Sequence, residues 1–125
     1  MENAILLDSN ILIAAFRRNE DAVSFLSKKN FNFVISDITT MELFAGCKTV
    51  EKRKEMESIL NFYARAPFTQ NVSRKAITLI KRYAVSTKTL HFPDLLIAAT
   101  ALNYKLPLKT LNTKDFDFIR EITLL

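Results

Sequence analysis

Residues 4–10 read Ala-Ile-Leu-Leu-Asp-Ser-Asn, an apolar run that ends in three polar residues. A short apolar run without alternation predicts a strand that is buried on both faces. The apolar residues at 11–16 then predict a helix from Ser9 to about Arg17. A buried strand followed at once by a helix is typical of α/β proteins with a parallel sheet.

The rest of the chain continues this alternation, which predicts a parallel sheet covered by helices on both faces. Pro67 cannot donate to a strand ladder, so its strand is expected at a sheet edge. Asn71 or Ser73 is expected to cap the helix that runs to about Val85, and Pro93 suits the first turn of the next. Further strands are predicted at residues 31–35, 65–69, 106–110 and 121–124, and further helices at 20–27, 37–47, 51–63 and 93–103.

The length of 125 residues fits one domain, residues 1–125, that is large enough to form its own core. Cys47 is the only cysteine, which excludes an intramolecular disulfide. No charged leader with a bounded apolar core opens the chain, and its apolar runs fall far short of the ~20 residues that a bilayer span needs. We therefore expect a soluble protein of the reducing cytoplasm, with no membrane partner.

The chain carries 18 Lys and Arg against 13 Asp and Glu, a formal charge of +5. Excess positive charge favours polyanionic partners, because their binding releases counterions. The basic residues gather in two predicted helices, which present either a phosphate-binding surface or ordinary solvated faces. The two runs are Lys48, Lys52, Arg53 and Lys54, and Arg74, Lys75, Lys81 and Arg82.

Four carboxylates stand where predicted elements begin or end. In parallel sheets, ligands bind beyond the carboxyl ends of the strands, where Asp8 and the segment 112–115 are expected. Carboxylate oxygens are the ligands that hard divalent cations prefer, and no cluster of Cys or His competes for zinc. The acids therefore predict a metal site, formed by Asp8, Glu42, Asp94 and Asp115.

Each acid also has a simpler explanation, because helix N-termini favour negative charge. Thr39 and Glu42 have the spacing of a capping box, in which the glutamate bonds back to the cap residue. Asp8 could cap the first helix, Asp94 could be a first-turn acid, and Asp115 could lie in a surface turn. For the four acids together, a metal site is favoured over these separate explanations. Asp8 and Asp94 adjoin strongly apolar sequence, in which an unpaired carboxylate is costly.

Composition argues against two other kinds of chemistry. Gly46 is the only glycine, so the chain has no Gly-rich phosphate loop for a nucleotide cofactor. His91 is the only histidine, so one chain cannot supply the histidine pair of a metal-free ribonuclease. We expect His91 to be a surface residue rather than a catalyst.

The four acids lie in blocks that read Leu-Leu-Asp8-Ser-Asn-Ile-Leu-Ile, Ser-Asp-Ile-Thr-Thr-Met-Glu42-Leu, Asp94-Leu-Leu-Ile-Ala-Ala-Thr-Ala-Leu and Thr110-Leu-Asn-Thr-Lys-Asp115-Phe. In order and spacing, these blocks resemble the PIN-domain nucleases, particularly the short VapC-type toxins of bacterial and archaeal toxin–antitoxin pairs. The resemblance covers essentially the whole chain.

The resemblance implies a three-layer α/β fold, in which a short, mostly parallel central sheet is flanked by helices. It also implies an endoribonuclease that uses Mg²⁺ or Mn²⁺ to hydrolyse RNA phosphodiester bonds, forms a homodimer and is silenced by a cognate antitoxin. By position, the catalytic, metal-binding acids would be Asp8, Glu42, Asp94 and Asp115. The residues that orient ligands or water behind them would be Ser9, Thr110 and Asn112.

The chain departs from the family pattern in two places. Leu111 stands where a basic residue is common, and residues 90–93 lack the glycine often found before the third acid. Both changes concern substrate contacts more than the metal site. Asp117 is a second acid near Asp115, but the alignment of Asn112 and Phe116 favours Asp115.

Two alternatives come from other functional classes. A receiver-like phosphorylation domain also gathers acids at strand ends, but it needs an acidic pair on its first strand, which Asn10 and Ile11 do not supply. A metal-free RNA-binding module would account for the charge and for the ten Phe and three Tyr. It would leave the acids unexplained, because without a cation they repel RNA.

Overall fold

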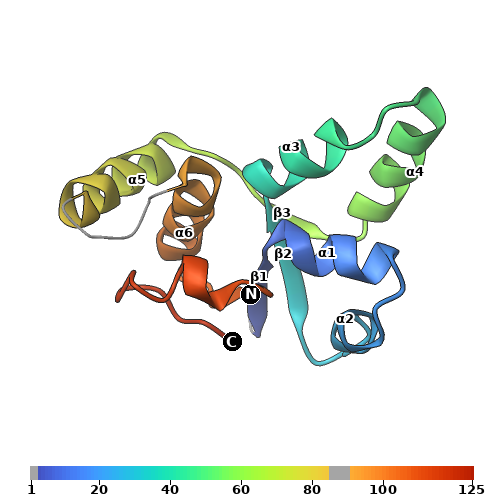
Figure 1. Cartoon of the computed structure of the whole chain (residues 1–125), viewed down its shortest axis with the longest axis horizontal. Coiled ribbons are helices and arrows are strands. Elements are labelled where there is room, and N and C mark those ends of the chain that lie inside the picture. Colours follow the sequence, from blue (N-terminus) through green and yellow to red (C-terminus); the bar gives the residue numbers. More distant parts are fainter. Residues whose placement is uncertain (1–2, 85–90) are drawn as a thin grey trace.

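The computed structural model describes residues 3–84 and 91–125 (Figure 1). Within these ranges one four-stranded sheet has the order β3-β2-β1-β4, and its neighbouring strands are parallel. The strands are β1 (Ala4–Leu7), β2 (Asn32–Ser36), β3 (Ala64–Ala66) and β4 (Leu108–Lys109). The helices are α1 (Ser9–Phe16), α2 (Glu20–Leu26), α3 (Asp37–Ala45), α4 (Val50–Leu60), α5 (Gln70–Tyr83) and α6 (Phe92–Tyr104), and the 3₁₀ helix η1 (Thr113–Asp115) follows β4.

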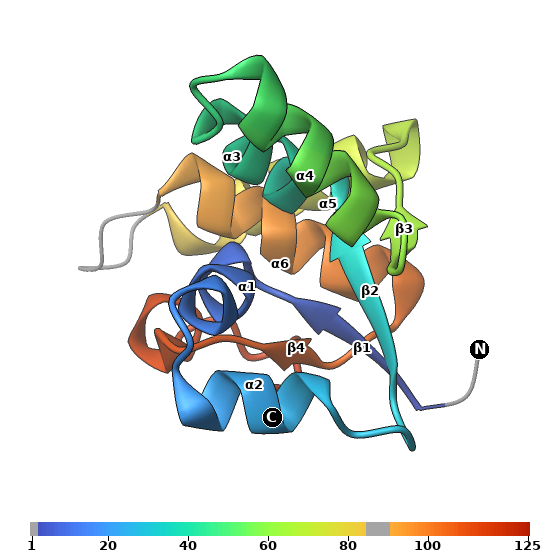
Figure 2. The same cartoon turned by 90° about the vertical axis from the view of Figure 1, so that its right-hand side faces the viewer.

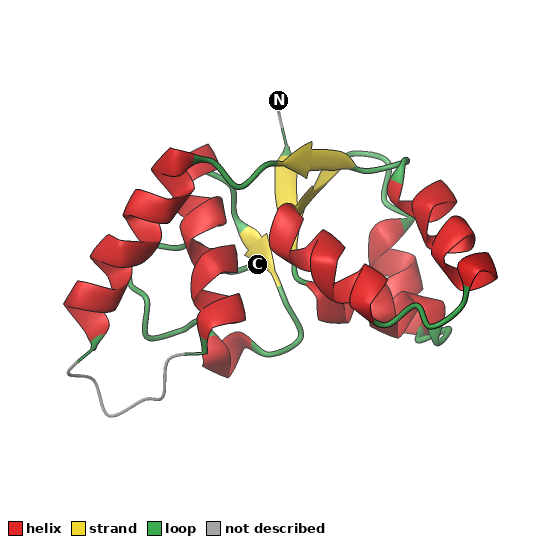
Figure 3. Ribbon diagram, turned by 90° about the horizontal axis from the view of Figure 1, so that it is seen from above, coloured by secondary structure: helices red, strands yellow, loops and turns green. Residues whose placement is uncertain are grey.

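Helices lie on both sides of the sheet. Figures 1 and 3 show α5 and α6 together on one side of the strands, and α1, α2 and α4 on the other. In Figure 2, β1 runs into α1 and β2 runs into α3. This arrangement confirms the predicted three-layer α/β fold with a parallel central sheet. Within the described ranges, no helix has the length and apolarity to cross a membrane.

The strand β1 lies between β2 and β4 and is buried on both faces. Ala4 and Leu6 belong to the core that the sheet shares with α5 and α6. Ile5 and Leu7 belong to the core on the opposite face. Because side chains alternate between the faces of a strand, a strand covered on both faces is apolar throughout, which is the pattern of residues 4–7.

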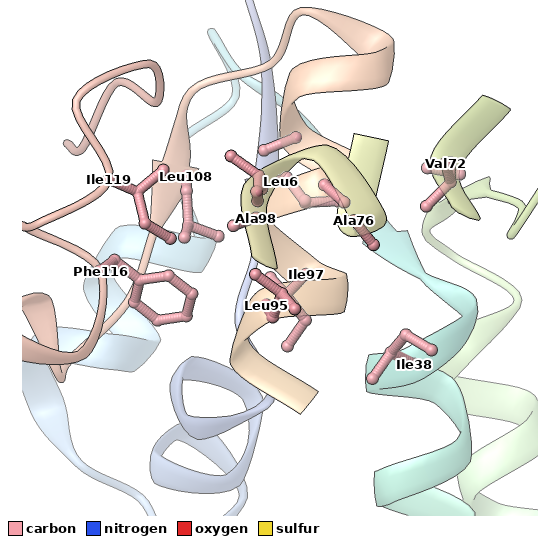
Figure 4. Close-up of a cluster of buried hydrophobic side chains, with 14 of the residues drawn as sticks. Leu6, Ile38, Val72, Ala76, Leu95, Ile97, Ala98, Leu108, Phe116 and Ile119 are labelled. Carbon is pink, nitrogen blue, oxygen red and sulfur yellow. The ribbon is translucent and has the colours of Figure 1, made fainter. Parts of the chain in front are cut away.

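The core on the α5 and α6 side draws on widely separated parts of the chain (Figure 4). Phe116 and Ile119, which follow η1, pack into it, so they anchor the segment that carries Asp115. The buried residues of α5 recur every three or four positions, which places them on one face of the helix. They are Val72, Ala76, Leu79 and Tyr83.

The core on the opposite face is smaller and joins α1, α3 and α4 to the sheet. Next to it, three aromatic rings from α2, β2 and the residue before β2 pack together, with centroid distances of 5.5 to 6.2 Å. The rings are Phe25, Phe31 and Phe33. The buried members of this core are Ile5, Leu7, Ile11, Leu12, Ile35, Leu43 and Leu60.

The cap of α5 differs from the prediction. Thr69 is the N-cap, and its hydroxyl accepts a hydrogen bond from the backbone N–H of Val72 at 3.3 Å. The predicted caps, Asn71 and Ser73, are wrong, because both lie inside the helix. The predicted helix end at Val85 lies outside the described residues.

The two prolines that guided the prediction have the expected positions. Pro67 follows the last residue of β3, which is an edge strand of the sheet. The strand is shorter than predicted because the ladder stops before the proline, which has no N–H to donate. Pro93 lies in the first turn of α6.

The last two predicted strands are much shorter in the structure. Only Leu108–Lys109 of the segment 106–110 forms a strand, and the segment 121–124 forms a single parallel bridge between Leu108 and Leu124. The start of the segment, three positions before Leu124, contacts α5 instead. Glu121 accepts a hydrogen bond from the Tyr83 hydroxyl and forms an ion pair with Arg82.

We predict that Phe116→Ala destabilises the protein by about 3–5 kcal/mol, because it leaves a large cavity at a fully buried position. Phe62→Ala is the matched control, since Phe62 is 89% exposed and its truncation should change stability by less than about 0.5 kcal/mol. Urea unfolding of both variants measures the difference. Equal stability of the two variants would contradict this assignment of the core.

Candidate active site

The four predicted acids lie at the carboxyl edge of the sheet or in elements that face this edge. Asp8 follows β1 and is the N-cap of α1. Glu42 lies in α3, which follows β2, and Asp115 ends η1, which follows β4. Since β2, β1 and β4 are parallel neighbours, these three acids follow adjacent strand ends, where such sheets bind ligands. Asp94 comes from the first turn of α6.

The charges of the four acids act on one another. Burial raises the pKa of Glu42, and the negative charge of Asp8 raises it further. Burial is also the largest cause that raises the pKa of Asp94, to about 6. The charges of the other three acids add to this increase, and His91 opposes it. The fold therefore gathers the predicted carboxylates into one cluster of like charge.

Asp8 is buried, with 6% of its surface exposed. Its Oδ1 accepts a hydrogen bond from the backbone N–H of Ser9, and its Oδ2 accepts one from the Thr110 hydroxyl, both at 2.8 Å. These bonds lower the pKa of Asp8, but burial outweighs them, so the pKa is raised overall. A nearby cation would stabilise the charged form of this carboxyl.

The capping explanation of Glu42 is wrong. The N-cap of α3 is Ser36, whose hydroxyl accepts from the backbone N–H of Thr39 at 3.0 Å. Thr39 therefore lies inside the first turn, and its hydroxyl donates to the Leu7 carbonyl at 3.4 Å. Glu42 lies six positions after the cap, beyond the reach of a capping box.

The helix-terminus explanation fits the positions of Asp8 and Asp94 better than it fits that of Glu42. Asp8 is confirmed as the N-cap of α1. The N-cap of α6 is His91, which makes no side-chain cap hydrogen bond, and Asp94 is a first-turn acid. A helix N-terminus stabilises a carboxylate, yet the pKa of each acid is raised. The helix ends therefore do not offset burial and mutual repulsion.

The acids form an open cluster rather than a closed cage. Within residues 3–84 and 91–125, no three Asp, Glu, His or Cys side chains are close enough to hold a metal ion directly. Mg²⁺ keeps several water ligands and binds through one or two carboxylates. The oxygen donors of this cluster fit a hydrated hard cation, whereas a structural zinc site needs four converging ligands.

Thr110 is the best-supported of the predicted orienting residues. Its buried hydroxyl donates to Asp8 and accepts from the backbone N–H of Asn112 at 3.1 Å. Asn112 is exposed, and its contact with Thr110 is made by its backbone N–H. Ser9 forms side-chain hydrogen bonds that lower the pKa of both Asp8 and Glu42.

Asn10 contacts the site residues although the sequence patterns did not predict it as one of them. Its Nδ2 donates to the Thr110 hydroxyl, and its Oδ1 accepts from the backbone N–H of Leu111, both at 3.1 Å. The sequence feature that could have indicated this role is an amide side chain two positions after Asp8, in the first turn of the helix that Asp8 caps. The partners lie about 100 positions away in the chain, so local patterns do not show them.

An open groove runs beside Glu42, between α1, α3 and α4. We call it the α1–α4 groove; its volume is about 720 Å³. Apolar side chains line much of it, including Ile13, Phe16, Met56 and Ile59. Lys52 of the first basic run also lines it. In the second basic run, Arg82 is engaged in the ion pair with Glu121.

Comparisons with known proteins give a consistent result. Residues 5–121 match the family model described as the PIN domain. The chain is 34% identical to ribonuclease VapC10 of Mycobacterium tuberculosis over 120 residues, which cover 94% of this chain and 90% of that protein. It is 30% identical to ribonuclease VapC of Rickettsia bellii over 129 residues, which cover 97% and 94% of the two chains.

A solved structure agrees with both relatives. A chain of a toxin–antitoxin complex from Klebsiella pneumoniae superimposes with a TM-score of 0.80 at 31% identity, over 95% of both chains. The family match extends from β1 to the segment after η1, so it includes all four acids and both layers of helices. The chain belongs to the PIN domain family.

Proposed function

We propose that the protein is a divalent-metal-dependent endoribonuclease and the toxin of a toxin–antitoxin pair. The observation that carries the proposal is the cluster of four carboxylates from separate elements, in which burial and then the charges of the other three acids raise the pKa of Asp94 to about 6. Such a cluster is costly for the fold and is typical of a functional site. The similarity to curated VapC ribonucleases supports RNA as the substrate.

In the proposed mechanism Asp8, Glu42, Asp94 and Asp115 would together hold a hydrated Mg²⁺ or Mn²⁺, some of them through its water ligands. When bound, the cation would supply positive charge to the scissile phosphate and lower the pKa of the attacking water. Ser9 and Thr110 hold Asp8 through hydrogen bonds to both of its oxygens. This leaves the remaining lone pairs of a pre-oriented carboxylate for ligands in the cluster.

Basic residues supply the attraction for the RNA backbone. The formal charge of +5 favours a polyanion, and Lys52 lines the same groove as Glu42. This supports α4 as a phosphate-binding helix beside the acids. Because Arg82 pairs with Glu121, the end of α5 is a weaker candidate for the same role.

We propose that the α1–α4 groove binds the cognate antitoxin. The supporting observations are its apolar lining, its position beside Glu42 and the similarity to a chain of a toxin–antitoxin complex. A partner with an amphipathic helix would bury the exposed side chains of Ile13, Phe16 and Ile59. Such a partner would also cover one side of the acid cluster and block access of RNA.

We further propose that the protein forms a homodimer and acts in the cytoplasm, where its RNA substrate is found. Large apolar side chains outside the groove support self-association. Phe68, Ile77 and Phe92 are between 42% and 66% exposed, and exposed apolar surface favours protein contacts. Light scattering of the purified chain measures the oligomeric state.

Glu42→Gln should reduce RNA cleavage by at least about 100-fold, because it removes a charged ligand and keeps the side-chain volume. The folded structure should persist, since Glu42 is not a helix cap. Cleavage is measured across a Mg²⁺ or Mn²⁺ titration, with Glu57→Gln of α4 as the exposed, matched control. Wild-type cleavage by Glu42→Gln throughout the titration would remove Glu42 from the proposed ligands.

The raised pKa of Asp94 predicts a pH dependence of stability. The folded protein binds this proton more tightly than the unfolded chain, whose pKa is near 3.8. The stabilising contribution is therefore complete below about pH 4 and is lost as the pH rises through about 6. Asp94→Asn should remove this loss, so without divalent cations the variant should melt at a higher temperature than the wild type above about pH 6.

The control for this prediction is Asp21→Asn, because Asp21 is also a first-turn helix acid. Its neutralisation should leave the melting temperature unchanged or slightly lower, by loss of the helix-dipole interaction. Adding Mn²⁺ should raise the melting temperature of the wild type more than that of Asp94→Asn. If Asp94→Asn and Asp21→Asn behave alike at every pH, Asp94 is an ordinary first-turn acid.

Phe16→Glu should weaken antitoxin binding at least about tenfold, because it places a charge in the apolar α1–α4 groove. Val23→Glu is the control, since Val23 is similarly exposed but lies outside this groove. Calorimetric titration with the purified antitoxin gives both dissociation constants. Equal effects of the two substitutions would place the antitoxin elsewhere.

A further inference from the structure

The orientation of the Asn10 amide follows from its neighbours. The backbone N–H of Leu111 can only donate, so the atom that it meets at 3.1 Å is the amide oxygen of Asn10. The amide nitrogen is then the end that faces the Thr110 hydroxyl, also at 3.1 Å. Asn10 therefore donates to Thr110 and cannot accept from it.

The Thr110 hydroxyl has a fixed direction for the same reason. A hydroxyl has one proton and two acceptor lone pairs. Asn10 Nδ2 and the backbone N–H of Asn112 both donate to this oxygen. The single Thr110 proton is thus left for Asp8 Oδ2, at 2.8 Å. Thr110 is 3% exposed, so bulk water does not compete for these positions.

Asn10 also joins two parts of the site that are distant in the chain. It lies in the first turn of α1, two positions after the acid that caps this helix. Thr110 and Leu111 follow β4 and lead into η1, which ends at Asp115. The two hydrogen bonds of Asn10 therefore add to the contacts that hold the Asp115 segment relative to Asp8.

We propose that Asn10 is a positioning residue of the metal site, which acts through the Thr110 hydroxyl. It directs the Thr110 proton to Asp8, so one carboxylate oxygen is held while the other lone pairs of the carboxylate face the cluster. It also holds the segment that carries Asp115. This inference rests on the proposed metal-dependent function.

A double-mutant cycle tests the proposal, with Mn²⁺ as the probe in calorimetric titration of the purified full chain. Asn10→Ala and Thr110→Val should each weaken Mn²⁺ binding about 10- to 100-fold. In the Thr110→Val background, Asn10→Ala should add less than about threefold, because the two residues act as one unit. Thr110→Ser keeps the hydroxyl and should recover most of the Mn²⁺ affinity that Thr110→Val loses.

The matched control is Asn19→Ala. Asn19 is also an asparagine at a helix start, and its Oδ1 accepts from the backbone N–H of Ala22 at 3.0 Å. Its loss should lower the melting temperature without changing the affinity for Mn²⁺. If Asn10→Ala does the same, its role is structural and the proposal is overturned. Fully additive effects of Asn10→Ala and Thr110→Val would also overturn it.

Measurements on the wild type distinguish a failure of this inference from a failure of the proposed function. If the wild type binds Mn²⁺ and cleaves RNA while Asn10→Ala keeps the full affinity, only the inference fails. If the wild type does not bind Mn²⁺, both fail. Asn10→Ser provides a second variant with the same expectation should Asn10→Ala not fold, because its shorter side chain cannot bridge Leu111 and Thr110.

Discussion

The pairing of β1 with β2 on one side and β4 on the other fixes where Asp8 lies. The ladder continues one residue beyond the strand, since the backbone N–H of Asp8 donates to the Lys109 carbonyl at 2.9 Å. Each face of β1 is covered by a different core. The first acid of the site therefore cannot move without disturbing both helical layers, and the other acids are placed relative to this rigid point.

In the acid cluster, the grouping of carboxylates at the site opposes the stability of the fold. Burial and like charges raise the pKa of Asp8, Glu42 and Asp94, so keeping them ionised costs stability. Ordinary folding requirements explain Asp8 as a helix cap, but they do not explain Glu42, which lies well inside α3. Departures of this kind are expected where a site is maintained for function at the expense of stability.

Local patterns predict much of this fold, and the failures have physical causes. The apolar run at residues 4–7 marks β1 because burial on both faces leaves no room for polar residues. The capping alternative for Glu42 was plausible because Ser36 and Thr39 are both good cap residues three positions apart, but only the Ser36 hydroxyl accepts from the helix. The four acids could be predicted from the sequence blocks in which they lie. The role of Asn10 could not, because it depends on a contact with a residue that is distant in the sequence.

The two edges of the sheet limit how this chain can assemble. At one edge β3 has three residues and is followed by Pro67, which cannot extend the ladder. At the other, the backbone of β4 is already engaged by the end of the chain, because Leu108 N–H donates to Thr123 and the Leu108 carbonyl accepts from Leu125. Neither edge offers a long row of free amides, which disfavours association by strand addition. The same protection lowers the tendency of the sheet to aggregate at high concentration.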